Sequence, residues 1–228
     1  MKRILFLAAA AACAMSAAAA GPGLATSVTG VQARQQQATS TASVLHDQSD
    51  PPFIYAIVSQ NFEAAYDSYD SQGADDFVVP SGQCWKITEV DVTGTYFNGP
   101  GPTQSMRVII YNDKDGTPHE KKIVSDQNGI VPTTDDNGKF VITLPDAVKA
   151  KPGKYWISVL ANMDLDVDGQ WAWQTRDGAL GTPSRWKNSG GGLRPECRKY
   201  GDMATCVGNL GDGALDYLFA LKGKSKAC

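Results

Sequence analysis

The sequence predicts an all-β protein, an antiparallel β-sandwich of the jelly-roll type with about ten strands. From residue 52 onward, short runs rich in Val, Ile, Tyr, Phe and Trp are separated by Gly, Asp, Asn and Pro. The acidic residues comprise 20 Asp and only four Glu, and Asp favours turns whereas Glu favours helices. Beyond the amino-terminal segment, no stretch longer than about two turns has helical periodicity.

The amino-terminal segment, residues 1–20, has the form of a secretory signal peptide. Two positive residues precede an apolar run over 4–13, and Ala18-x-Ala20 forms a small-residue cleavage site. Cys13 offers a lipid-modified cysteine as an alternative, but the residues before it lack a large aliphatic side chain. We therefore expect export to a secreted or periplasmic location. No other segment approaches the ~20 apolar residues of a membrane span.

The remaining chain divides into three parts. Residues 21–51 are rich in Ala, Ser, Thr and Gln, which predicts a disordered spacer. Residues 52–223 form the predicted β-sandwich, and residues 224–228 a short basic tail. Without residues 1–20, 19 Lys and Arg stand against 24 Asp and Glu, a net charge of −5. That balance argues against nucleic acid or an anionic membrane surface as a partner.

Ten segments have the composition of strands, and several alternate cleanly. In 139–144 and 154–161 the apolar side chains recur at every second residue. The segment 84–96 changes phase, so a bulge near Thr88 and Glu89 is needed to bring its apolar residues to one face. The predicted strands are 53–58, 75–79, 84–96, 106–111, 120–124, 139–144, 154–161, 170–176, 183–187 and 215–222.

Three turn signals separate these segments: NDKDG at 112–116, DQNG at 126–129 and TDDNG at 134–138. Asp-Gly and Asn-Gly pairs supply the positive φ angles of tight hairpins.

Four cysteines lie beyond the signal segment, and an even number in an exported protein suggests two disulfides. Three pairings are possible. We favour Cys197–Cys206, which closes a small loop, and Cys84–Cys228 follows by elimination. A zinc site is disfavoured, because no two cysteines have C-x₂₋₄-C spacing and the chain has only two histidines.

The run from Tyr66 to Phe97 contains ADDFVVPSGQCWKI, followed by an extended strand that ends near a glycine and an aromatic residue. It resembles the opening of exported bacterial β-sandwich modules with the pattern A-D-D-F-x-V-P-x-G-x-x-W-x-I. The later segments GKYWISVLAN, GQWAWQT and DYLFALKG also fit, so the resemblance covers most of 53–223. It implies a galactose-binding-like jelly roll used as an accessory or surface domain, and it carries no catalytic residues.

NMDLDVDGQW, residues 162–171, places Asp164, Asp166 and Asp168 at alternate positions before a glycine, like the first half of a calcium loop. The twelfth position of such a loop is Thr175, which has no carboxylate. The segments on either side, 154–161 and 170–176, are predicted strands, so a hairpin loop is the alternative. Repulsion among three carboxylates still makes this a candidate calcium site, completed by a neighbouring loop.

The candidate ligand-binding residues lie near the glycine-rich segment 188–213. Trp186 is the best candidate for an exposed sugar-stacking ring, although large aromatic residues usually fill the core. Arg194 and Arg198 lie in this segment, which the Cys197–Cys206 disulfide would staple, and they are candidates for polar contacts. A solvated connection is the alternative for this loop.

The sequence shows none of the usual catalytic motifs: G-x-S-x-G, H-E-x-x-H and a phosphate loop are all missing. Paired carboxylates from Asp75, Asp76, Asp91 and Asp216 could still meet in the fold, as in a hydrolase. We expect a non-catalytic recognition module, with carbohydrate or a surface protein as partner. The alternatives are a structural or protein-interaction module and, less favoured, an unrecognised hydrolase.

Overall fold

The computed structural model describes residues 42–208 and 215–228. The predicted signal peptide and most of the predicted spacer lie outside these residues. The described residues form strands in two sheets, with 3₁₀ turns η1 (Ala64–Tyr69) and η2 (Pro195–Cys197) and one helix, α1 (Met203–Val207). The all-β prediction is confirmed. None of the described helices is long and apolar enough to cross a membrane.

The first sheet has eight strands. Its main path runs β1-β15-β5-β11-β14, while β2 pairs with β11, β9 with β5, and β8 with β9. Among the described residues, every pairing of these strands is antiparallel, and all but β8–β9 join segments far apart in the chain. Its members are β1 (Ser43–Asp47), β2 (Pro52–Val58), β5 (Gln83–Phe97), β8 (Thr134–Asp136), β9 (Lys139–Ala150), β11 (Gln170–Arg176), β14 (Asp216–Tyr217) and β15 (Phe219–Ala227).

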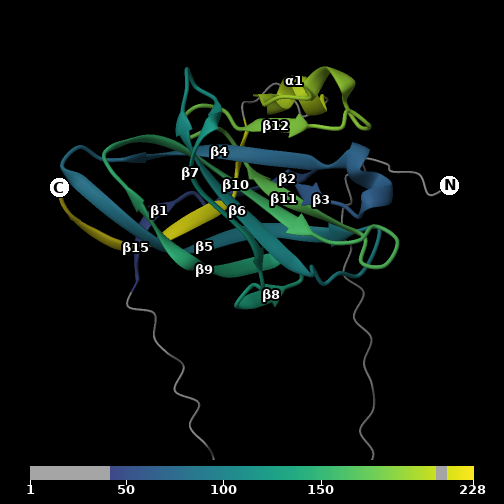
Figure 1. The fold of residues 1–228 in the computed structure, drawn as a ribbon, viewed down its shortest axis with the longest axis horizontal. Helices are drawn as coiled ribbons and strands as arrows, with labels where there is room; N and C mark the ends of the chain where they lie inside the picture. Colours follow the sequence, from purple (N-terminus) through teal and green to yellow (C-terminus); the bar gives the residue numbers. More distant parts are fainter. Residues whose placement is uncertain (1–41, 209–214) are drawn as a thin grey trace, which may run out of the picture. The chain divides into compact units, whose positions relative to one another are not determined.

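The second sheet has seven strands in the order β13-β12-β4-β3-β10-β6-β7. Strands β4 and β10 pair directly along part of their length, and the short β3 lies between their other ends. Figure 1 shows α1 beside β12 at the top of the view and β8 at the bottom. The strands of the second sheet are β3 (Gln60–Asn61), β4 (Ser71–Val79), β6 (Ser105–Asp113), β7 (Pro118–Ile130), β10 (Gly153–Asn162), β12 (Arg185–Asn188) and β13 (Gly201–Asp202).

The core lies between the sheets and is rich in aromatic side chains. Phe77 of the seven-stranded sheet stacks on Trp85 of the eight-stranded sheet, with ring centroids 6.2 Å apart. Trp173 stacks on Tyr217 at 4.5 Å, and both side chains are fully buried. Alternation along each strand sends these residues inward and the intervening polar residues outward.

Each of the ten predicted strands overlaps a strand of the structure, and the predicted 215–222 segment is divided between β14 and β15. The count is fifteen among the described residues, because short strands such as β3 and β13 lack a periodic pattern of their own. The domain also extends beyond the predicted 52–223. Ser43–Asp47, predicted as spacer, pairs with β15, and most of the predicted basic tail belongs to β15.

The predicted bulge is confirmed. The register between β5 and β9 shifts between Ile87 and Glu89, and Trp85, Ile87, Val90 and Val92 are all buried. The prediction of a hairpin turn at DQNG, residues 126–129, is wrong. Gly129 has a φ of 75° but lies inside β7, where the register with β6 is irregular, so it serves a bend in a continuous strand.

Both predicted disulfides are present, Cys84–Cys228 and Cys197–Cys206. The first ties the start of β5 to the residue that follows β15. The second closes the short segment around η2 and α1.

Candidate functional site

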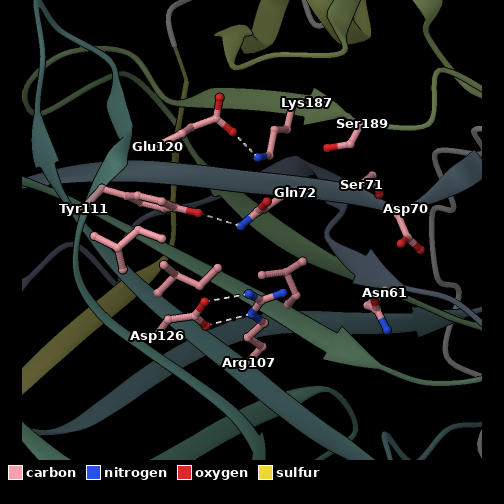
Figure 2. Close-up of a pocket in the computed structure, with 13 residues that line it drawn as sticks. Asn61, Asp70, Ser71, Gln72, Arg107, Tyr111, Glu120, Asp126, Lys187 and Ser189 are labelled. Atoms are coloured by element: carbon pink, nitrogen blue, oxygen red, sulfur yellow. Dashed lines mark hydrogen bonds and ion pairs between the residues drawn. The ribbon is translucent and has the colours of Figure 1, made fainter. Parts of the chain in front are cut away.

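A pocket of about 310 Å³ opens on the outer face of the seven-stranded sheet, near the place where β3 separates β4 from β10. Most of its side chains come from β3, β4, β6, β7, β10 and β12, and Figure 2 shows them gathered over these strands. A rigid sheet face therefore positions most of the site. The lining residues are Asn61, Asp70, Ser71, Gln72, Arg107, Ile109, Tyr111, Glu120, Ile123, Asp126, Leu160, Lys187 and Ser189.

The floor of the pocket is apolar. Ile109, Tyr111 and Leu160 belong to a second buried cluster on the outer face of the sheet, which also contains Trp156. Alternation explains this cluster, because the neighbours of these residues on β6 and β10 point into the core between the sheets. Tyr111 turns its hydroxyl to Gln72, whose Nε2 donates to it at 3.2 Å.

One side of the pocket is an ion pair between β6 and β7. Arg107 donates from two guanidinium nitrogens to the two carboxylate oxygens of Asp126, at 2.8 and 2.6 Å. These hydrogen bonds raise the pKa of Arg107 above its ordinary value. A bidentate pair of this kind fixes both planar groups in one orientation.

The opposite side of the pocket holds a second ion pair, between Lys187 of β12 and Glu120 of β7. The Lys187 ammonium also lies 4.5 Å from the ring centroid of Tyr200, and Tyr111 meets the same ring edge-on at 6.0 Å. Burial raises the pKa of Tyr200 well above its ordinary value, so this ring stays neutral. The segment that carries Tyr200 thus holds the lysine in place through an aromatic contact.

The end of the pocket is held by Asn188, a fully buried amide. Its Nδ2 donates to the carbonyl oxygens of Ser68 and Asp70, at 2.9 and 2.8 Å. Its Oδ1 accepts from the backbone N–H groups of Leu193 and Arg194. One side chain therefore joins the glycine-rich loop after β12 to the end of η1.

Two glycines allow this loop to lie against η1. A Cβ on Gly190 would lie 2.4 Å from the Cα of Ser68, and one on Gly192 would lie 2.7 Å from the Ser68 carbonyl oxygen. The close approach brings Ser189 to the same end of the pocket as Asp70 and Ser71. Burial raises the pKa of the Asp70 carboxyl, which accepts a hydrogen bond from the N–H of Phe62 at 2.8 Å.

The prediction that Trp186 is an exposed sugar-stacking ring is wrong. Trp186 is fully buried, and its Nε1 donates to the carbonyl oxygen of Val58 at 2.9 Å. It points into the core because β12 pairs with β4 in a register that turns Arg185 and Lys187 outward. The lysine beside the predicted tryptophan is the residue that reaches the pocket.

The two predicted arginines do not line the pocket. Arg194 donates from its guanidinium to the carbonyl oxygen of Val207 at 2.7 Å, which ties the loop to the end of α1. Arg198 is exposed, and its guanidinium lies close to Gly191. Arg198 lies within the segment closed by Cys197–Cys206, which also carries Tyr200, and Arg194 lies just before it. Neither arginine lines the pocket.

The three aspartates of 162–171 build a turn. Asp164 accepts from the N–H groups of Asp168 and Gly169 through its carbonyl oxygen, at 2.8 and 3.2 Å. The Asp168 carboxylate accepts from Gln104 at 3.2 Å. Within residues 42–208 and 215–228, no group of three His, Cys, Asp or Glu side chains is arranged to hold a metal ion. The calcium prediction for Asp164, Asp166 and Asp168 gains no ligand from another loop there.

Three of the four carboxylates suggested for a hydrolase do come together, but in the interior. Asp75 is fully buried and accepts from Gln48 Nε2 and the N–H of Tyr217, at 2.9 and 2.6 Å. Asp76 and Asp216 lie beside it. Burial raises the pKa of Asp75 well above its ordinary value, with a further rise from the charge of Asp216.

This cluster lies outside the pocket lining, while Asp91 is engaged elsewhere by Lys222. It explains the Asp-Asp pair of the ADDF motif structurally, as a buried hub that joins β4 to β14 and to the segment after β1.

Replacing Asp216 with Asn should flatten the pH dependence of stability. Burial, aided by the charge of Asp76, raises the pKa of Asp216 to about 6. Because the folded pKa exceeds the unfolded one, folding binds a proton between about pH 4 and 6, and stability falls as pH rises through that window. Relative to the parent, Asp216→Asn should gain on the order of 2 kcal/mol from pH 4 to 7, measured by urea unfolding.

The matched control is Asp136→Asn, since Asp136 is exposed on β8. Its stability curve should run parallel to that of the parent. Parallel curves for Asp216→Asn as well would show that Asp216 does not carry the titration.

No protein-family model matches this sequence, and no curated protein matches it. Among solved structures, the chain is similar to the cysteine protease and lectin-like domains of Cwp84, a surface layer associated protein of Clostridium difficile. The TM-score is 0.43 at 10% identity, and the match covers 69% of this chain and 32% of that one. This chain thus corresponds to about a third of that chain's length. A likeness of this size assigns neither a family nor an activity.

Proposed function

We propose that this domain is a non-catalytic recognition module of an exported protein, and that the pocket on the seven-stranded sheet binds a neutral carbohydrate. The observation that carries the proposal is that each cation of the pocket is already paired. Arg107 is neutralised by Asp126 and Lys187 by Glu120. With Asp70, the lining holds three carboxylates and two cations, so an anionic ligand would meet net repulsion.

The lining suits sugar hydroxyls. Ion-paired carboxylates retain lone pairs for O–H donors, while the amides of Asn61 and Gln72 offer both donors and acceptors. The apolar floor of Ile109 and Leu160 can cover the C–H face of a pyranose ring. No nucleophile–base pair lies in the lining, which contains neither histidine nor cysteine. Recognition is therefore better supported than catalysis.

The test is a binding screen of the exported chain on an array of neutral and acidic oligosaccharides. The decisive variant is the double substitution Arg107→Ala with Asp126→Ala, which removes the ion pair without leaving a lone charge. It should weaken binding of the best neutral glycan by roughly tenfold or more, because two oriented hydrogen-bonding groups are lost.

The control removes an ion cluster from the other sheet without leaving a member unpaired, Lys222→Ala with Glu89→Ala and Asp91→Ala. That variant should bind the glycan as the parent does. If the array shows no neutral glycan bound, or if the pocket variant binds undiminished, the carbohydrate proposal is wrong.

A further inference from the structure

Lysine side chains form a line across the outer face of the eight-stranded sheet, opposite in the sandwich to the pocket. Lys224 of β15 pairs in register with Lys86 of β5, and Lys86 pairs with Lys149 of β9. Lys226 follows on β15, two residues along and therefore on the same face. All four side chains are exposed. We call Lys86, Lys149, Lys224 and Lys226 the basic row.

The orientation of the row follows from its neighbours. Trp85 and Ile87 flank Lys86 and are buried, and Val148 and Ala150 flank Lys149 and are buried. Since successive side chains of a strand point to opposite faces, the lysines must point outward.

Stability of the fold does not explain the row. Like charges directly opposite on neighbouring strands destabilise a sheet. Among the described residues none of the four lysines takes part in a salt bridge, and the nearby Glu89 and Asp91 are both engaged by Lys222. Lysines often protect an exposed sheet edge, and this could account for Lys149, Lys224 and Lys226, whose strand pairings among the described residues are on the β5 side only. It does not account for Lys86, which lies between two paired strands.

Charge complementarity identifies the partner. The full chain carries a formal net charge of −3, so an unneutralised basic row is a local exception. Neighbouring strands lie roughly 4.8 Å apart, so the three paired lysines extend about 10 Å in a line across the sheet. We propose that an acidic polysaccharide binds along the basic row, with its carboxylates or sulfates against the ammonium groups.

Two other polyanions fit less well. Single-stranded nucleic acid is usually bound by aromatic side chains that stack on the bases, and the row has none. A membrane surface usually needs an apolar or aromatic wedge beside the cations, and the row itself contributes only lysines. A flat line of lysines is sufficient to bind an acidic polysaccharide, because the carboxylates or sulfates of such a polymer lie on its outside.

The test measures binding of polygalacturonate to the full chain in low salt. The variant Lys86→Gln, Lys149→Gln and Lys224→Gln should weaken this binding by roughly tenfold or more, and added salt should weaken binding to the parent. The matched control replaces Lys114, Lys139 and Lys199, three exposed lysines elsewhere, with Gln. It removes the same charge and should retain binding.

Each other outcome overturns the proposal. These outcomes are no binding of polygalacturonate, undiminished binding to the row variant, and equally weak binding to both variants through net charge alone. Binding to phosphatidylglycerol vesicles without polygalacturonate would assign the row to a membrane instead. Thermal unfolding of both variants checks folding, and the row variant should melt no lower than the control. The Arg107→Ala, Asp126→Ala variant should still bind polygalacturonate, which separates this site from the pocket.

Discussion

Replacing Cys84 and Cys228 together with serine is expected to lower the free energy of unfolding by about 5 kcal/mol. The two cysteines are 144 residues apart, so their disulfide closes a loop that spans most of the described domain. In the chain-entropy account, a disulfide stabilises the fold by restricting the unfolded chain, and the effect grows with the logarithm of loop length. Urea unfolding of the parent and the double variant measures the difference.

The other disulfide provides the internal comparison. Cys197 and Cys206 are nine residues apart, and the same account gives about 3 kcal/mol for their removal. Removing the Cys84–Cys228 disulfide should therefore lower the free energy of unfolding more than removing Cys197–Cys206. A larger loss from Cys197→Ser with Cys206→Ser would contradict loop entropy as the main term. It would show instead that the short disulfide holds a contact that the fold requires.

Replacing Trp173 with Ala should destabilise the domain by about 3–5 kcal/mol, the range for deleting a buried aromatic side chain. Trp173 is fully buried between Tyr217 and Trp171, with ring centroids 4.5 and 6.3 Å away. Its Nε1 also donates to the carbonyl oxygen of Leu218 at 2.8 Å. The substitution leaves a cavity and removes one of the two hydrogen bonds that the Leu218 carbonyl oxygen accepts, the other coming from the N–H of Thr93 at 3.3 Å. Both losses act in the same direction. The loss is measured by equilibrium unfolding in urea.

Two further variants separate these terms. Trp173→Phe retains an aromatic ring but loses the hydrogen bond, and it should cost less than Trp173→Ala. Val167→Ala changes an exposed residue and should stay within about 0.5 kcal/mol of the parent. Equal losses for Trp173→Ala and Val167→Ala would mean that this part of the core is not packed as described.

Much of the fold could be predicted from the sequence because it depends on local pattern. The alternation in 139–144 assigns Phe140, Ile142 and Leu144 to one face, and all three are buried. The change of phase in 84–96 predicts the bulge before Glu89. These features follow from the two-residue period of a strand, which is visible in a single segment.

The candidate site could not be predicted in the same way. Gln72, Arg107, Asp126 and Lys187 are separated by long stretches of chain, and they meet only because β12, β4, β10, β6 and β7 lie side by side. Each is an ordinary outward-facing polar residue in its own strand. The one local signal is the pair of cations, Arg185 and Lys187, that flank Trp186. In a strand they point to the face opposite the tryptophan, so when the ring is buried the lysine faces outward.

The aspartate-rich loop is a motif whose partners in space are not visible in the sequence, and its calcium site stays a prediction. The Asp168 carboxylate accepts from Gln104 and from the N–H of Asp164, and the Asp164 carbonyl oxygen accepts from N–H groups of the same turn. Aspartate side chains are typical of turns and strand ends, where they accept hydrogen bonds from backbone N–H groups. Asp75 instead lies inside the sheet, because Gln48, Tyr217 and Asp76 supply donors that no local pattern announces.

The pairing of β1 with β15 also determines how the domain responds to tension. Ser43 lies opposite Gly223 and Asp47 opposite Ala220. The amino-terminal end of β1 and the carboxyl-terminal half of β15 are therefore at the same end of this antiparallel pair. A pull on the two ends of the described chain therefore opens this pair one hydrogen bond at a time, as a zipper opens. The Cys84–Cys228 bond passes the force on β15 directly to β5. We therefore expect β1 to detach before the rest of the sheet, after which the hydrogen bond from Gln48 to Asp75 carries the load.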